Sequence, residues 1–150
     1  MKIFVGSDHG GFEYKASVIA KIQALDHEAV DKGAFSLDPD DDYPQFAFAV
    51  GESVAALPQD QAKGILLCRS GAGMTIAANK VPHIRAVQAR SQEEVKHACE
   101  HNDANVLTLS ADWLSEEEIL NLVETFLVTP FSKEARHQRR VEQIAAYESN

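Results

Sequence analysis

Short apolar runs alternate with longer segments of helical periodicity along the chain. The run Gly64–Cys68 is continuously apolar, which is typical of a strand buried on both faces of a parallel sheet. Residues 12–25 instead carry apolar side chains at positions 12, 16, 18, 19, 22 and 25, a spacing typical of an amphipathic helix. Alternation of this kind predicts a parallel sheet covered by helices on both faces.

The remaining elements follow from the same pattern and from signals at helix ends. Ser91 with Glu94, and Ser115 with Glu118, are predicted capping boxes. Pro44 suits the first turn of another helix. We expect strands near 3–5, 28–30, 64–68, 84–88 and 106–109, and helices near 12–25, 44–57, 74–80, 91–101, 115–128 and 131–147. Neither a repeat nor a linker interrupts residues 1–150, so a single domain is predicted.

Charge and cysteine content narrow the class of protein. The 150 residues carry 14 basic and 23 acidic side chains, a net charge of −9, which argues against nucleic-acid or anionic-membrane partners. Cys68 and Cys99 form neither a CxxC pair nor a disulfide framework. No apolar run approaches the roughly 18 residues of a membrane-spanning helix. The sequence therefore predicts a reduced, cytoplasmic protein.

The turn at residues 6–11 is the first candidate for chemistry, because open parallel sheets bind ligands beyond the carboxyl ends of their strands. Its glycines permit the close approach of a ligand, and Asp8 and His9 add a hydrogen-bond acceptor and a titratable group. The alternative is an ordinary glycine turn in which Asp8 caps the helix.

The turn from Cys68 to Gly73 is the second candidate. Its glycines expose backbone N–H groups at a helix N-terminus, an anion site whose positive field favours a Cys68 thiolate near neutral pH. The alternative is a cysteine that only fills a buried position at the end of a strand. The nucleotide-binding motifs GxxxxGK[ST] and GxGxxG are both missing from this turn.

Two other clusters have plainer interpretations. His97 and His101 have the spacing of metal ligands on one helix, but a third ligand is missing, so no metal site is predicted. The aspartates at 38, 40, 41 and 42 lack the glycine and glutamate of a calcium loop, which favours a solvated acidic loop.

A basic patch lies on the last predicted helix. Arg136, Arg139 and Arg140 are neighbours at helical spacing, which suits a small anion such as phosphate. The alternative is a solvated helix whose arginines pair with Glu134 and Glu142.

Taken in order, these segments resemble the ribose-5-phosphate isomerase B family, which also contains galactose-6-phosphate isomerase subunits. The resemblance runs nearly from end to end, and the joint order and spacing of its short motifs make it specific. The motifs are Gly6-Ser7-Asp8-His9-Gly10-Gly11-Phe12, Asp42-Tyr43-Pro44, Gly71-Ala72-Gly73-Met74, Ile76-Ala77-Ala78-Asn79-Lys80, Ile84-Arg85-Ala86, the segment from Glu100 to Leu107, Arg136-His137 and Arg140-Val141.

The resemblance implies a Rossmann-like, three-layer αβα subunit with a five-stranded parallel sheet and an extending C-terminal helix. It also implies a homodimer, or a tetramer, with active sites built from both chains. The implied reaction interconverts ribose 5-phosphate and ribulose 5-phosphate in the pentose phosphate pathway, through an enediolate and without metal or other cofactor. A six-carbon aldose phosphate, such as allose or galactose 6-phosphate, is an alternative substrate.

The catalytic roles implied by the resemblance carry over by position. Cys68 is the implied base that moves a proton between C2 and C1, because the glutamate base of one family branch falls at Met74. The enediolate oxygen is stabilised by the Ser70 hydroxyl and by the backbone amides of Gly71, Ala72, Gly73 and Met74.

The resemblance also implies roles for the groups that hold the sugar and the phosphate. His101 opens the furanose ring, Asp8 holds the sugar oxygens, and Asn102 lies nearby. The implied phosphate contacts are the side chains of His9, Arg136 and Arg140, with His137 adjacent.

Three positions depart from the family pattern. Arg69 and Ser110 replace glycines, and Asp112 stands where the family commonly carries an arginine that helps to bind phosphate. An anion in place of that cation adds repulsion beside a dianionic ligand. We hypothesise that Arg69 supplies the missing charge; the alternative is that Arg69 faces solvent or pairs with Asp112. Because of these two changes, a non-catalytic protein that binds sugar phosphates is the second functional class.

Overall fold

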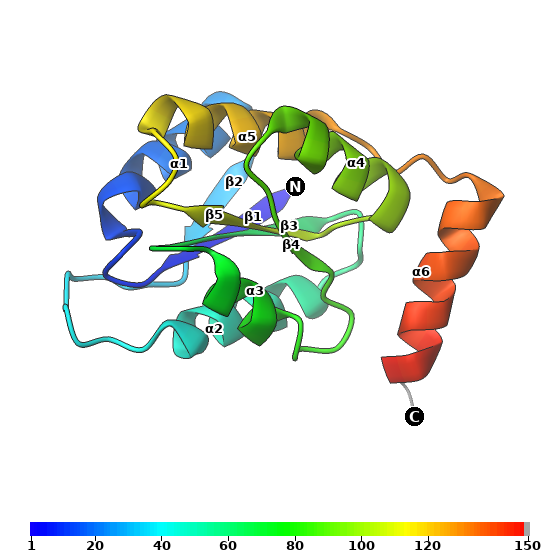
Figure 1. Ribbon diagram of the computed structural model, residues 1–150, viewed down its shortest axis with the longest axis horizontal. Coiled ribbons are helices and arrows are strands. Elements are labelled where there is room, and N and C mark those ends of the chain that lie inside the picture. The colour runs from blue at the N-terminus through cyan, green and yellow to red at the C-terminus, as the bar shows by residue number, and fades with distance from the viewer. Residues whose placement is uncertain (149–150) are drawn as a thin grey trace.

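The computed structural model describes residues 1–148 and contains one parallel sheet between two layers of helices (Figure 1). The sheet order is β2-β1-β3-β5-β4. The strands are β1 (Lys2–Ser7), β2 (Glu28–Asp31), β3 (Ala62–Cys68), β4 (Ala86–Gln88) and β5 (Val106–Ser110). The helices are α1 (Phe12–Ala24), α2 (Tyr43–Ala55), α3 (Ala72–Ala78), α4 (Gln92–Asn102), α5 (Glu116–Val128) and α6 (Ala135–Glu148). The predicted three-layer α/β architecture with five parallel strands is confirmed.

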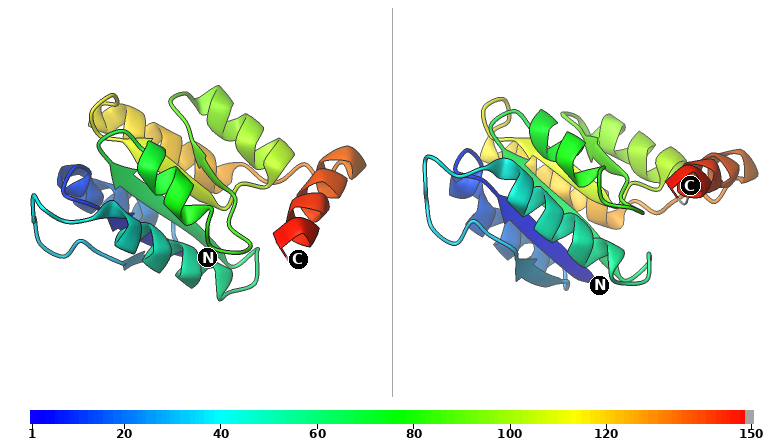
Figure 2. Two further views of the ribbon diagram at one scale, coloured as in Figure 1. Left: turned by 60° about the horizontal axis from the view of Figure 1, so that its bottom comes forward. Right: turned by 90° about the horizontal axis from the view of Figure 1, so that it is seen from below.

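Strand β3 shows how the sequence builds the two layers. Ile65 and Leu67 pack into the core under α1, α4 and α5, whereas Leu66 and Cys68 pack into the core under α2 and α3. Successive side chains of a strand point to opposite faces, so an uninterrupted apolar run supplies both cores at once. Figure 2 shows α2 and α3 lying across one face of the sheet.

The turns after β1 and β3 meet because of the strand order. The chain leaves β1 for β2 on one side and then crosses to β3 on the other side of β1. Ser7 is paired in register with Leu67, and Cys68 with Ser110, so the carboxyl ends of three strands form one edge. The edge therefore lies at the topological switch point, where parallel sheets bind ligands.

The two predicted capping boxes differ in the structure. Ser115 and Glu118 form both reciprocal bonds, as predicted. Ser91 Oγ accepts from the Glu94 N–H, but the Glu94 carboxylate accepts from the N–H of Arg90 instead of Ser91. The Ser91–Glu94 box is therefore only half formed, because the Glu94 carboxylate bonds to Arg90, the residue before Ser91.

The C-terminal helix begins four residues later than expected. Lys133 has a left-handed backbone, with φ +57°, which interrupts the helix predicted from residue 131. The Ser132 N–H donates to the Glu100 carbonyl oxygen, which fixes the connecting segment to the end of α4. Helix α6 then extends past α4 beyond the edge of the sheet, as expected for an extending helix (Figure 1). Among the described helices, none has the length and apolar character that crossing a membrane requires.

Candidate active site

The Asp8 carboxylate organises the turn after β1. Its Oδ1 accepts hydrogen bonds from the backbone N–H groups of Gly10 at 2.9 Å and Gly11 at 3.3 Å. Burial raises the pKa of this carboxyl group, and the two N–H donors oppose that rise. The residue that caps α1 is Gly11, without a side-chain bond, so Asp8 braces the turn and not the helix itself.

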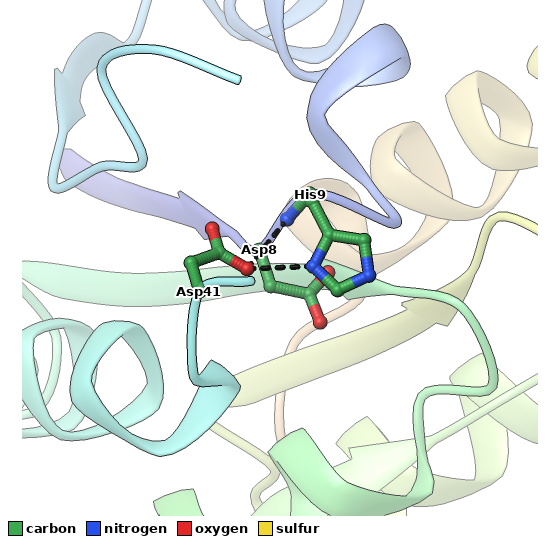
Figure 3. A group of neighbouring side chains, drawn as sticks. All are labelled: Asp8, His9 and Asp41. Carbon is green, nitrogen blue, oxygen red and sulfur yellow. Dashed lines mark hydrogen bonds and ion pairs between the residues drawn. The ribbon is translucent and has the colours of Figure 1, made fainter. Parts of the chain in front are cut away.

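His9 is held by an aspartate from a distant loop. Asp41 Oδ1 accepts from the backbone N–H of His9 at 3.1 Å and lies 2.7 Å from His9 Nδ1 (Figure 3). The Asp41 side chain is only 6% exposed. The expectation that all four loop aspartates are solvated is therefore wrong for Asp41, since the loop folds back over the turn after β1.

The turn after β3 places the Cys68 thiol against backbone N–H groups. Gly71 has a left-handed backbone, with φ +86°, and its N–H donates to Cys68 Sγ at 3.0 Å. Burial nevertheless raises the pKa of the thiol, and the nearby Asp8 raises it further, against the lowering effect of the Gly71 N–H. The expectation of a Cys68 thiolate near neutral pH is wrong for this chain, because desolvation outweighs the field of the helix N-terminus.

The same turn is braced from the neighbouring strands. Ser70 Oγ accepts from the Ala72 N–H at 3.3 Å, and the Ser70 carbonyl oxygen accepts a short hydrogen bond from the Gln88 amide. Ser110 Oγ donates to the Arg69 carbonyl oxygen at 2.7 Å. The hydroxyl of Ser110, at one of the positions that depart from the family pattern, thus fixes the backbone beside the thiol.

Arg69 forms an ion pair with Asp112. Arg69 Nε lies 3.1 Å from Asp112 Oδ2, and the two side chains are 67% and 41% exposed. The predicted pairing of Arg69 with Asp112 is therefore present. The stem of Arg69 also packs over Gly10, and its charge lowers the pKa of His9, so the guanidinium lies beside the turn after β1.

A second group of predicted site residues forms a stack of histidines where α4 meets α6. The ring centroids of His97 and His101 are 4.0 Å apart, and those of His101 and His137 are 4.1 Å apart. His137 is buried, and its Nδ1 lies 2.8 Å from Ser132 Oγ. Burial, together with the neighbouring imidazoles and Arg136, lowers the pKa of His101, which favours its neutral form.

The basic patch on α6 faces solvent in the single chain. Arg136 Nε donates to Glu134 Oε2 at 3.0 Å, whereas Arg139 and Arg140 are exposed. The ion pair with Glu134 that the alternative predicted is thus present at Arg136. Glu142 instead accepts from the Gln138 amide at 3.0 Å.

The predicted site residues form two groups, one at the carboxyl ends of the strands and the other at the opposite, amino-end side of the sheet. Helix α4 begins beyond the carboxyl end of β4 and ends before the amino end of β5, so its C-terminal residues lie far from the turn after β3 (Figure 1). Within one chain, the carboxyl-edge group contains Asp8, His9, Cys68, Arg69, Ser70, Gly71, Ala72, Gly73 and Met74. The opposite group contains His101, Asn102, Arg136, His137 and Arg140.

One cluster in the described part of the chain has the geometry for a cation. The ligand atoms of Asp8, His9 and Asp41 lie within 4.8 Å of one another. However, His9 Nδ1 already faces Asp41 Oδ1 as a hydrogen-bond partner. We therefore interpret this group as a hydrogen-bonded pair beside a buried carboxyl.

Several contributing residues could not be found from local sequence signals. Asp41 reaches His9 only because a long loop folds over, and Gln88 reaches Ser70 only because β4 joins the sheet at its edge. Tyr43 lies against Gly73, where an added Cβ would come within 2.7 Å of the ring. None of these three contacts leaves a spacing pattern, although Tyr43 belongs to one of the quoted motifs.

The carboxyl edge brings together the parts of an acid–base site for proton transfer. A buried thiol lies among backbone N–H groups, a hydroxyl stands beside it, and a buried carboxyl and an imidazole occupy the adjoining turn. A base of this type next to N–H donors can remove a proton from carbon while the donors stabilise the oxyanion that develops. The arrangement suits a small anionic substrate.

Comparison with known proteins gives one consistent family. The profile of the family described as Ribose/Galactose Isomerase matches residues 3–144. Ribose-5-phosphate isomerase B of Mycolicibacterium paratuberculosis is 44% identical over 148 residues, covering 99% of this chain and 92% of the relative. The protein of the same name from Mycobacterium tuberculosis is 40% identical over 148 residues, with 99% and 90% covered.

Solved structures agree with this result. Ribose-5-phosphate isomerase B from Mycoplasma genitalium, with bound ribulose 5-phosphate, has a TM-score of 0.95 at 37% identity, covering 99% of this chain and 97% of that one. The type B ribose 5-phosphate isomerase of Trypanosoma brucei has a TM-score of 0.91 at 39% identity, with 97% of each chain covered. Similarity therefore extends over nearly the whole chain in both sequence and fold.

Proposed function

The chain belongs to the Ribose/Galactose Isomerase family, and we propose that it interconverts ribose 5-phosphate and ribulose 5-phosphate. The observation that carries this proposal is the placement of the Cys68 thiol, with its Gly71 N–H contact, beside the buried Asp8 carboxyl at the switch point of the sheet. A base, N–H donors and a polar group for sugar hydroxyls are what an aldose–ketose isomerisation requires.

In the proposed mechanism, Cys68 acts as its thiolate and removes the proton from C2 of the open-chain aldose. The electron pair of the C2–H bond forms the C1–C2 double bond of an enediolate, and the carbonyl pair moves onto O1. The O2 proton then passes to O1, the carbonyl re-forms at C2, and Cys68 returns its proton to C1 to give the ketose. The Ser70 hydroxyl and the amides of residues 71–74 stabilise the enediolate oxygen. Since burial raises the pKa of Cys68, the thiolate is a strong base but a small fraction of the thiol at neutral pH.

We further propose that the site is completed by a second copy of the chain in a homodimer. His101, Asn102, Arg136 and Arg140 lie at the edge opposite Cys68, and both arginines are exposed. A two-fold dimer would bring this edge of one subunit to the carboxyl edge of the other. There the partner's neutral His101 would open the furanose ring, and the two arginines would bind the phosphate together with His9. The stacked His137 ring would hold the His101 imidazole in place.

Arg69 is proposed as an additional cation for the phosphate. Asp112 holds the guanidinium through Nε. The guanidinium hydrogen bond runs through Nε, which leaves the terminal NH2 groups to contact a ligand. Asp112 therefore holds the Arg69 guanidinium in place, although the negative charge of Asp112 itself repels phosphate.

The deciding experiment is an activity panel on the purified protein with five- and six-carbon aldose phosphates. Turnover of ribose 5-phosphate that Cys68→Ala reduces by about 10²–10⁴-fold supports the proposal. Preference for allose or galactose 6-phosphate would reassign the substrate. Binding of sugar phosphates without turnover would identify a non-catalytic protein, and full activity of Cys68→Ala would exclude this thiol as the base.

A cytoplasmic location fits the two free cysteines of the described chain.

A further inference from the structure

Asp41 contacts His9 through a single carboxylate oxygen that serves two donors. Oδ1 accepts from the His9 backbone N–H at 3.1 Å and from His9 Nδ1 at 2.7 Å. The aspartate side chain is 6% exposed, whereas the imidazole is 30% exposed (Figure 3). We propose that Asp41 is a positioning residue that orients the His9 imidazole and stabilises its protonated form as an anchor for the substrate phosphate. This inference rests on the proposed function.

The contact fixes which ring nitrogen meets the ligand. A carboxylate at Nδ1 requires a proton on that nitrogen, so Nε2 is the nitrogen left for the site. In Figure 3 the second ring nitrogen points away from Asp41. A protonated ring then presents an N–H donor and a positive charge to an anion. A ring without this hydrogen bond can rotate its donor away, and its positive charge is less favoured.

The groups that surround His9 include some that raise its pKa and some that lower it. The hydrogen bond to Asp41 is the largest influence and raises the pKa of His9. Burial and the Arg69 charge lower this pKa, while Asp8 raises it. Asp41 is therefore the largest single influence on the His9 pKa, and its removal should lower that pKa.

The loop that carries Asp41 has anchors of its own at its base. The base of that loop is already fixed by hydrogen bonds from the Ser7 N–H to the Gly33 carbonyl oxygen at 2.8 Å and from the Ala34 N–H to the Ser7 carbonyl oxygen at 2.7 Å. The Lys15 ammonium also bridges Asp31 to the Ala34 carbonyl oxygen. A substitution at Asp41 should therefore alter His9 while leaving the fold in place.

The test compares Asp41→Asn with Asp40→Asn, which makes the same charge change one residue away on an exposed side chain. NMR titration of the free protein should show a lower His9 pKa in Asp41→Asn and no change in Asp40→Asn. For ribose 5-phosphate, Asp41→Asn should raise KM about threefold to tenfold near neutral pH with a smaller effect on kcat. The difference in KM should shrink as the pH falls and His9 becomes protonated in both proteins.

Failure of this inference can be told apart from failure of the proposed function. The His9 titration needs no substrate, and the affinity for inorganic phosphate can be measured on the same variants without turnover. Unchanged His9 pKa and phosphate affinity in both Asp41→Asn and Asp41→Ala would overturn the inference, even in an active isomerase. If ribose 5-phosphate is not turned over but Asp41→Asn lowers both quantities, the positioning role stands and the proposed reaction falls.

Discussion

The Gly71 N–H donates a hydrogen bond to Cys68 Sγ at 3.0 Å, yet the thiol remains harder to ionise than a free cysteine. The two effects oppose each other: the N–H group stabilises the thiolate, and burial destabilises it more. The proposed catalytic thiol is thus packed in the core, and it also accepts a hydrogen bond that favours its ionised form. Cys68 therefore combines the burial of a small hydrophobe with the N–H contact that supports its proposed role as a base.

The raised pKa of Cys68 predicts how its ionisation and its contribution to stability depend on pH. The folded state holds the thiol proton more tightly than the unfolded state does. This contribution to stability is therefore full below the unfolded pKa and is lost as the pH rises toward the folded pKa. Thiolate absorbance at about 240 nm, compared between the wild-type protein and Cys68→Ser, should show Cys68 ionising above the range of free cysteine. A Cys68-dependent thiolate signal at neutral pH would contradict this prediction.

The Arg69–Asp112 pair predicts opposite effects of two substitutions on substrate binding. Arg69→Ala removes a cation from the turn beside His9 and should raise KM for ribose 5-phosphate by a factor of about three to ten. Asp112→Asn removes the anion but keeps an oxygen that can accept from Arg69 Nε, so it should lower KM. Stability should change by less than about 1 kcal/mol in either variant, because the ion pair is largely exposed. An unchanged KM in Arg69→Ala would rule out its role in binding phosphate.

The separation of the two groups of site residues predicts complementation between inactive variants. Cys68→Ala and His101→Ala each should inactivate their own homodimer. In a dimer formed from one chain of each, one site carries both defects and the other carries neither. Mixing equal amounts after reversible dissociation should therefore restore about a quarter of the wild-type activity.

The control for this experiment is a mixture of Cys68→Ala with Cys68→Ser, which has no intact site and should stay inactive. Failure of the first mixture to gain activity, with dimers demonstrated by mass measurement, would place all the catalytic groups within one chain. The same mass measurement distinguishes a dimer from a tetramer.

The close approach of the turn after β1 to strand β3 predicts that Gly11→Ala is strongly destabilising. A Cβ at Gly11 would lie 2.4 Å from Leu67 Cβ and 2.6 Å from the Leu67 backbone carbon, so the backbone of the turn must move away from β3. Overpacking of this kind costs about 1–3 kcal/mol, and it would also displace Asp8. Denaturant unfolding should show the loss of stability. Gly51→Ala is the matched control, since its closest contact is a Val81 methyl group at 3.0 Å and a helical alanine is favourable; an equal loss in both would contradict the prediction.

The periodicity of the sequence was enough to predict the elements and their layers. Strand β3 illustrates the reason: an apolar run from Gly64 to Cys68 can be satisfied only where both faces are covered. Helix ends were less secure, because they depend on single backbone conformations. The left-handed Lys133 delays α6, and no composition signal reports a dihedral angle of that kind.

The sequence by itself determined the fold class, the turns proposed to carry the chemistry and, through its motifs, the family, because these depend on the order and type of residues along the chain. Only the tertiary structure decided how groups far apart in sequence meet. Asp41 reaches His9, Arg69 pairs with Asp112, and burial outweighs the helix terminus at Cys68. Contacts and desolvation depend on distances between chain segments, and these distances exist only once the strands have paired.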